Sequence, residues 1–216
     1  MLSTLTGAVR GFSTESKVIK HLKAERVFEQ ENYSPVKDKV SVLEKTGYSL
    51  TESDTSKLMV MTKQSGDYEI NIFFEARTPA PAENYQPEQG EQPDEEQDQE
   101  MEDFVDFTVS VSKPGAAKGL VIDCACFNSE LSINYVTAVE QPEKYARESR
   151  LSRAPDQYLG PEFGTLEERV QVAMQDFLQG LGLDDEVVTF IEIYSLDKEQ
   201  RLYMNWLDDV EAFLSH

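Results

Sequence analysis

Basic residues are scarce in this chain. Its 216 residues hold 20 Lys and Arg against 41 Asp and Glu, which gives a formal net charge of −21. A protein that reads nucleic acid needs clustered basic side chains that displace counterions from phosphates. The charge therefore excludes a nucleic-acid reader, and for the same reason it excludes binding to anionic membranes. We expect no direct contact with nucleic acid.

Cysteine, histidine and long apolar runs are also in short supply. The cysteines, Cys124 and Cys126, are two residues apart, and the only histidines are His21 and His216. This set cannot build a four-ligand zinc site of the usual kind or the disulfide framework of a secreted domain. No apolar run approaches the roughly 20 residues that a membrane-spanning helix requires. We predict no membrane insertion, no metal and two buried cysteines, with a vicinal redox pair as the alternative.

Catalytic signatures are absent as well. The sequence has no phosphate-binding P-loop, no GxSxG nucleophile motif and no HExxH metal motif. Carboxylates abound, but a solvated carboxylate lacks the burial that raises its pKa for acid–base catalysis. We predict no catalytic residues, no cofactor and no enzymatic activity.

What the chain does have is acidic charge, concentrated in two blocks. Residues 78–112 carry 11 acidic and no basic residues, and residues 162–216 carry 13 acidic and three basic residues. Separated blocks of this kind indicate a built electrostatic face. The alternative is that both blocks are only solvated surface.

The first block contains a segment, residues 78–103, that is polar, rich in proline and free of bases. Such a segment cannot offset the entropy lost on ordering, so we predict a mobile acidic loop between two strands. It lacks the DxDxDG spacing of a calcium loop. We take its densest part as the candidate partner-binding face. These acids are Glu91, Asp94, Glu95, Glu96, Asp98, Glu100, Glu102 and Asp103.

The N-terminus has the opposite character. Residues 1–12 contain one Arg and no acid, and the stretch ends in Arg10-Gly11-Phe12 before Ser13. This composition is typical of a mitochondrial targeting segment, with an ordinary chain terminus as the alternative. We place a single domain at residues 13–216, beginning with a helix that runs from Ser13 to about Asn32.

The middle of the chain alternates between apolar and polar residues, which predicts strands. Short turns between them imply an antiparallel meander, because parallel pairs need long crossovers. A short extended piece is expected at residues 40–42, and a polar loop with clustered bases at residues 140–163. The six predicted strands cover residues 47–51, 57–64, 68–76, 104–112, 119–127 and 130–139.

The second acidic block has helical periodicity. A capping box of Thr165 and Glu168 opens one helix, and Asp184 and Asp185 open another of about 30 residues, roughly 45 Å long. One small sheet cannot cover that length, so we expect Trp206 and its stripe to be buried by the sheet or by a neighbouring subunit. The alternative for Trp206 is a partner-binding anchor that is exposed in the free protein. The residues expected in the core or the oligomer contact are Tyr203, Trp206, Val210 and Phe213.

Several strings resemble the mitochondrial acidic matrix protein family. They are Gly47-Tyr48-Ser49-Leu50, GLVIDC at residues 119–124 and the tail from Lys198 to Phe213. The resemblance implies an α+β fold, in which a twisted seven-stranded antiparallel sheet carries one N-terminal and two C-terminal helices. It also implies a doughnut-shaped homotrimer with an asymmetric acidic surface. The seventh strand would fall near residues 157–164, where the residues themselves predict only a loop.

The same resemblance implies a function. The protein would be a non-enzymatic, chaperone-like binding protein of the mitochondrial matrix. Its partners would be basic proteins, such as RNA-binding or ribosomal proteins, and it would modulate mitochondrial RNA processing, editing or translation. The alternative is a multi-ligand surface receptor or a protein that buffers cations and counter-ions.

Overall fold

Six antiparallel strands lie side by side in chain order, β1-β2-β3-β4-β5-β6. The computed structural model describes residues 6–37, 39–78, 104–148 and 158–215, with side chains from residue 14 onward. The elements are α1 (Thr6–Asn32), α2 (Lys39–Thr46), β1 (Ser49–Thr51), β2 (Leu58–Ser65), β3 (Tyr68–Glu75), β4 (Val105–Ser112), β5 (Gly119–Phe127), β6 (Glu130–Val139), α3 (Pro142–Arg147), η2 (Phe163–Thr165), α4 (Glu168–Leu181) and α5 (Asp185–Leu214).

The two faces of the sheet differ in polarity because successive side chains of a strand point to opposite faces. On one face Met61, Ile72, Val109 and Ile122 align across β2 to β5, and all four are buried. The opposite face carries a polar row of Thr62, Asn71, Ser110 and, beyond Val121, Thr137.

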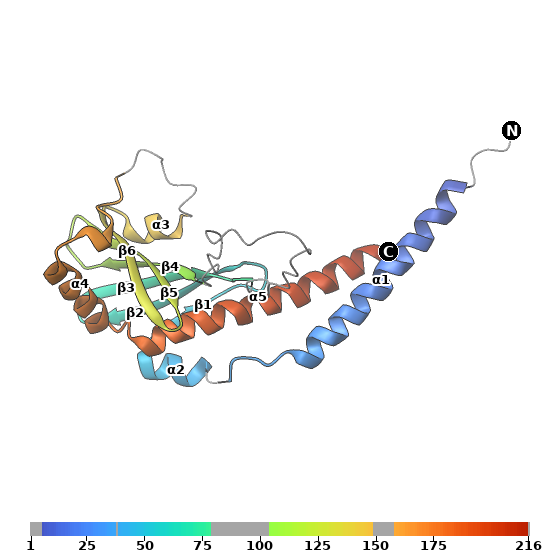
Figure 1. The fold of residues 1–216 in the computed structure, drawn as a ribbon, viewed down its shortest axis with the longest axis horizontal. Helices are drawn as coiled ribbons and strands as arrows, with labels where there is room; N and C mark the ends of the chain where they lie inside the picture. Colours follow the sequence, from blue (N-terminus) through green and yellow to red (C-terminus); the bar gives the residue numbers. More distant parts are fainter. Residues whose placement is uncertain (1–5, 38, 79–103, 149–157, 216) are drawn as a thin grey trace, which may run out of the picture.

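The helices are distributed according to this difference. The apolar face packs against α4 and α5 through Leu178, Leu181, Val187 and Ile191, which form one core with the strands. Helix α3 covers part of the polar face, where Ala146 packs with Phe73. Figure 1 shows α2 and α5 on one side of the sheet and α3 on the other.

Most predicted elements are confirmed. β5 and β6 have the predicted ends, and the other four strands overlap their predicted ranges. α5 begins where expected, because the Asp184 side chain accepts a hydrogen bond from the Val187 N–H at 3.0 Å and caps the helix. Its 30-residue length is also as predicted.

Two predictions near the N-terminus are wrong. α1 begins at Thr6 rather than Ser13, since adding one residue to a formed helix is far easier than starting a new one. Residues 40–42 are helical, not extended. Val42 and Leu43 pack against the core, and the Thr46 hydroxyl donates to the Val42 carbonyl at 2.7 Å, so packing overrides the β-branched preference.

Two further corrections concern the segments around α4. The polar stretch after β6 contains the short helix α3, which starts at Pro142, where a missing N–H is tolerated. The capping box does not form. The Thr165 hydroxyl donates to the Glu162 carbonyl at 2.7 Å, and α4 starts after Glu167 without a side-chain cap.

The seventh strand is absent from the described part of its expected range, residues 158–164. The chain does pass the outer edge of β6 there, because the Thr137 hydroxyl donates to the Leu159 carbonyl at 2.6 Å. Gly160 then adopts φ = 91° and Pro161 has no N–H to donate, so the segment cannot continue as a strand.

The tight approach at Gly160 gives a stability prediction. A Cβ added there would lie 2.5 Å from the Val136 carbonyl oxygen, at a φ that L side chains rarely adopt. We expect Gly160→Ala to lower the free energy of unfolding by about 1–3 kcal/mol, measured by urea denaturation. Gly164→Ala is the matched control, since its Cβ would meet no atom within 4 Å. Equal stability of the two variants would contradict the account of this segment.

Candidate functional site

The end of β1 carries a carboxylate that gathers charges from two helices. Glu52 accepts hydrogen bonds from Tyr194 Oη at 2.7 Å, Lys39 Nζ at 3.0 Å and Arg201 Nη2 at 2.9 Å. Lys198 Nζ lies 3.3 Å from the same carboxylate. We call these five residues the Glu52 cluster. It joins β1 and α2 to the middle of α5.

The cluster changes how its acid titrates. Burial alone would raise the pKa of Glu52, but the hydrogen bonds from Tyr194, Arg201 and Lys39 outweigh it and lower the pKa to about 2. The ammonium of Lys198 is fully buried and also donates to the Ser53 carbonyl at 2.7 Å. A buried charge of this kind is tolerated only when it is paired and hydrogen-bonded.

A second carboxylate extends the cluster to α1. Asp197 accepts from Arg201 Nε at 2.8 Å and from the hydroxyl of Tyr33, just beyond α1, at 2.8 Å. Burial, together with this hydrogen bond, raises the pKa of Tyr33 to about 12. The end of α1 is therefore fixed to α5 at the point where α5 leaves the sheet.

Beyond that point α1 and the C-terminal half of α5 run side by side and project from the sheet as an arm (Figure 1). Arg26 Nη1 lies 2.5 Å from Asp208 and Lys23 Nζ 3.4 Å from Glu211. The bases of α1 thus partly neutralise the second acidic block. Among the described residues of α5, Asp185, Glu192, Glu199 and Asp209 form no ion pair, although Glu192 accepts a hydrogen bond from the Ser129 N–H at 3.0 Å.

The predicted stripe on α5 lies on this arm. Trp206 is 53% exposed and Phe213 is 80% exposed, whereas Tyr203 and Val210 are half-buried. The Tyr203 and Trp206 rings stack with centroids 6.0 Å apart. Burial of Trp206 against the sheet is therefore wrong, because this exposed residue lies on the part of α5 that runs beside α1. Burial by a neighbouring subunit stays a prediction.

The eight acids predicted as the partner-binding face, from Glu91 to Asp103, lie outside the described residues. Within the described residues, exposed carboxylates without an ion pair include Asp106 at the sheet and Asp185 and Asp209 on α5.

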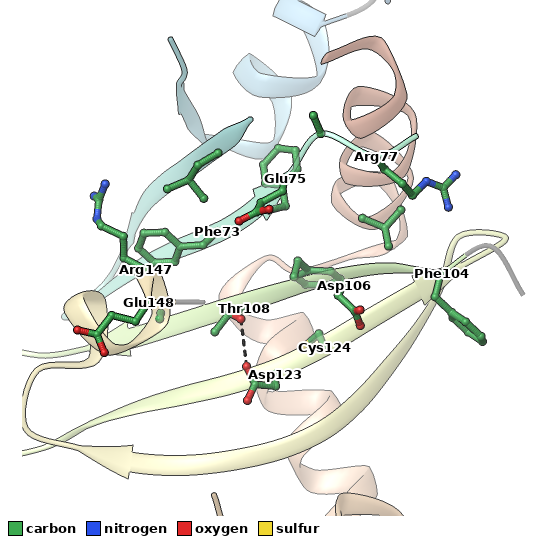
Figure 2. A pocket seen from close by; sticks show the side chains of 16 residues that line it. Phe73, Glu75, Arg77, Phe104, Asp106, Thr108, Asp123, Cys124, Arg147 and Glu148 are labelled. Atoms are coloured by element: carbon green, nitrogen blue, oxygen red, sulfur yellow. Dashed lines mark hydrogen bonds between the residues drawn. The ribbon is translucent and has the colours of Figure 1, made fainter. Parts of the chain in front are cut away.

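A cavity of about 340 Å³ opens on the polar face of the sheet (Figure 2). Its floor includes Phe73 and Thr108, and the Thr108 hydroxyl donates to the buried Asp123 carboxylate at 3.0 Å. Arg147, from α3, lies over the Phe73 ring at 5.5 Å. The charged residues that line the cavity are Glu75, Arg77, Asp106, Asp123, Arg147 and Glu148.

Cys124 also lines this cavity, and burial raises the pKa of its thiol well above the ordinary value. Because the thiolate is the nucleophilic form, this cysteine is unreactive at neutral pH. The cavity therefore offers polar recognition rather than a nucleophile. Cys124 and Cys126 are both buried and unbridged, which confirms the prediction for them.

Neither a metal site nor a membrane span is found in the described ranges. No group of three or more His, Cys, Asp or Glu side chains there could hold a metal ion. No helix described is both long and apolar enough to cross a bilayer.

The residues of the Glu52 cluster were not predicted from the sequence. One signal was present: Lys198 follows Val187, Ile191 and Tyr194 at helical spacing, so it occupies a position of the buried stripe of α5. A lysine at such a position requires an acidic partner. The partner, Glu52, is 146 residues away in the chain and carries no local mark.

The chain has the features of one class of acidic α+β proteins. These features are an antiparallel meander, an apolar sheet face covered by C-terminal helices, and an arm formed by the two terminal helices. Two comparisons give its family. The chain belongs to the MAM33 family, described as mitochondrial glycoprotein, whose model matches residues 21–214. It is 26% identical over 215 residues to the mitochondrial acidic protein mam33 of Schizosaccharomyces pombe, covering 92% of this chain and 78% of that protein. The resemblance seen in the sequence is thus confirmed.

Solved structures support the same fold. The p22 protein of Trypanosoma brucei superposes with a TM-score of 0.69 at 18% identity, covering 94% of this chain and 99% of that one. A Leishmania major protein, described as a sequence homologue of human p32, superposes with a TM-score of 0.69 at 14% identity, covering 93% and 99%.

The Glu52 cluster gives a pH prediction. The pKa of Glu52 is lowered from 4.5 to about 2, so its ionised form stabilises the fold above pH 4.5, and this stabilisation is lost as the pH falls toward 2. We expect Glu52→Gln to lower the free energy of unfolding at neutral pH by about 3 kcal/mol, because it leaves buried cations unpaired. The variant should also lose part of the pH dependence in that window. Chemical denaturation at a series of pH values measures both.

The control is Glu44→Gln, which removes an exposed glutamate of α2 that forms no ion pair. It should leave both stability and its pH dependence unchanged. A Glu52→Gln variant as stable as the control would show that the cluster is not needed for the fold.

Proposed function

We propose that the chain is a non-enzymatic, chaperone-like binding protein of the mitochondrial matrix that assembles as a homotrimer and binds basic proteins. RNA-binding and ribosomal proteins are the partner classes that its charge fits best, so its effect would fall on mitochondrial RNA processing or translation. The observation that carries the proposal is the net charge of −21 concentrated in two blocks. Its membership of a mitochondrial family supports the compartment.

The charge acts mainly on encounter. A one-sign surface raises the rate at which an oppositely charged protein arrives, and it suppresses binding of acidic molecules. Within the arm, Lys23 and Arg26 of α1 neutralise two carboxylates of α5 through ion pairs. The segment from residue 78 to 112 has no base of its own, so it is the stronger source of attraction.

The arm supports assembly. Trp206 and Phe213 are large apolar side chains that are exposed in the single chain, and they lie on one stripe of α5 with Val210. Such a stripe is expected to be covered in an assembly. α1 adds exposed Val18, Val27 and Phe28. Burying such side chains stabilises an assembly by about 1.5–3 kcal/mol each when burial is complete.

The trimer is tested by light scattering. We expect a mass of about 73 kDa, three times the 24.5 kDa chain. Phe213→Ser should shift the mass toward the monomer, whereas Val172→Ser, which changes a 48% exposed residue of α4 off the stripe, should not. Trp206 emission should be blue-shifted in the assembly and become open to iodide quenching in Phe213→Ser. A wild-type monomer at micromolar concentration would refute the trimer.

Binding is tested with the acidic segment. Deleting residues 83–100 removes eight acids, and a length-matched variant replaces the same acids by Gln and Asn. Both should weaken binding to an arginine-rich ribosomal protein, measured by titration calorimetry. Wild-type affinity should fall steeply between about 0.1 M and 1 M salt, as the Debye length shrinks from about 10 Å to about 3 Å.

The same two variants separate a docking role from a structural one. Their melting temperature should equal that of the wild type or rise slightly, since like charges repel one another. A large loss of stability would mean that the segment packs on the fold. Undiminished binding would assign the contact to the acids of α4 and α5 instead.

A further inference from the structure

The cavity of Figure 2 already contains one guanidinium group over an aromatic ring. The guanidinium carbon of Arg147, which belongs to α3, lies 5.5 Å from the centroid of the Phe73 ring. A cation within about 6 Å of a ring centroid is attracted to the face of that ring, and arginine is the side chain most often found there. The floor of this cavity, whose volume is about 340 Å³, is thus suited to a guanidinium.

The strand register places carboxylates beside this floor. Thr108 of β4 lies between Phe73 of β3 and Asp123 of β5, so these three residues share one face of the sheet. Asp106 precedes Thr108 by two residues and therefore lies on the same face. It is diagonal to Phe73 and to Asp123, which places it about 7–8 Å from each. Asp106 is exposed, so an aromatic ring and an accessible carboxylate lie side by side at the cavity.

The charges that remain unpaired in the lining of this cavity are negative. Asp106 and Glu148 are exposed, and neither forms an ion pair within the part of the chain that the structure describes. The other charged lining residues have partners: Glu75 pairs with Lys57, Arg147 pairs with Glu143, Asp123 accepts from Thr108, and Arg77 has a contact of its own. Charge complementarity at this cavity therefore selects a cation.

Arg147 is held over the floor only weakly. Its ion pair with Glu143 has a length of 3.3 Å, and the two side chains are 53% and 58% exposed. Exposed pairs of this kind contribute little to stability, because water screens the charges and two long side chains lose freedom. An arginine from another molecule can therefore take the place of Arg147 at small cost. It would gain Asp106, a carboxylate with which Arg147 forms no ion pair.

We propose that the cavity binds the guanidinium group of an arginine of a basic partner protein, which replaces Arg147 over Phe73 and forms an ion pair with Asp106. The inference rests on the proposed function and makes it more specific. The net charge of the chain attracts any basic protein. A ring beside a positioned carboxylate distinguishes arginine from lysine, because only the flat guanidinium can stack on the ring while its N–H groups reach the carboxylate. Arg147 then acts as a competitor within the chain.

The experiment uses two labelled peptides of glycine and lysine that differ only in their central base, which is arginine in the first and lysine in the second. Binding to the full chain at low salt is followed by fluorescence anisotropy. The arginine peptide should bind about fivefold tighter, because it gains the contact with the ring. Added salt should weaken both peptides but keep their ratio, since their charges are equal.

Asp106→Asn tests the carboxylate. It should reduce the preference for the arginine peptide to less than about twofold, because the ion pair that orients the guanidinium is lost. The matched control is Glu69→Gln. Glu69 is exposed, forms no ion pair among the described residues and lies on the same face of β3, about 13 Å along the strand from Phe73. This variant removes the same charge, so it should weaken both peptides equally and keep the preference.

Arg147→Gln tests the competitor. A site that is partly occupied binds an added ligand more weakly by the fraction that is free. Removing Arg147 should therefore raise the affinity of the arginine peptide about threefold more than that of the lysine peptide. Lys144→Gln is the control, because it removes the same charge from an exposed residue of α3 that does not line the cavity. It should strengthen both peptides equally. Circular dichroism and melting temperatures verify that all four variants fold.

The outcomes separate the two levels of the proposal. If neither peptide binds the wild type, the proposed function fails and this inference fails with it. If both peptides bind equally, or if the preference survives in Asp106→Asn, only the assignment of the cavity is wrong. A loss of the preference in Arg147→Gln would show that Arg147 helps binding and would overturn the competitor role. A change of subunit number in Asp106→Asn would assign the cavity to a second copy of the chain and overturn the proposal.

Discussion

The buried pairing of Glu52 with Lys198 is the interaction on which the arrangement of the helices depends. A long amphipathic helix can pack on a sheet at several registers, because apolar contacts are non-directional. A buried ammonium admits few of them, since an unpaired charge in this place would be strongly destabilising. Lys198, held by Glu52 and the Ser53 carbonyl, therefore fixes where α5 lies along the sheet. Lys39, Tyr194 and Arg201 extend the same constraint to α2 and, through Asp197 and Tyr33, to the end of α1.

The arm follows from that anchoring. With its N-terminal half fixed on the sheet, the rest of the 30-residue α5 must extend past the strands, and α1 is the only described helix that reaches it. The pairing brings two acids three residues apart on α5 against two bases three residues apart on α1, as in Arg26 with Asp208 and Lys23 with Glu211. Acidic charge on α5 is consequently split between carboxylates paired with α1 in the arm, Asp208 and Glu211, and carboxylates without an ion pair, such as Asp185 and Asp209. The aromatic side chains of the arm are left facing solvent in the single chain.

The surface of the protein carries two kinds of side chain whose interactions differ in range. Carboxylates act over about a Debye length and respond to salt, so under the proposed function they would set how fast a basic protein arrives. Exposed apolar side chains such as Trp206 and Phe213 act only on contact and respond little to salt.

The sequence by itself determined the elements whose signals are local. Alternation of apolar and polar residues placed β2 to β6. It does so because successive side chains of a strand point to opposite faces of the sheet, so the polarity of each residue indicates which face it lies on. Asp184 marked the start of α5, and the count of acids and bases set the net charge of −21. Only the tertiary structure decided the rest. Residues 40–42 are helical despite the β-branched Val40 and Val42. The positive φ of Gly160 prevents a seventh strand within residues 158–164. Lys198 pairs with Glu52, which is 146 residues away in the chain. Each of these depends on which distant side chain or backbone is close by, and spacing along the chain does not encode that.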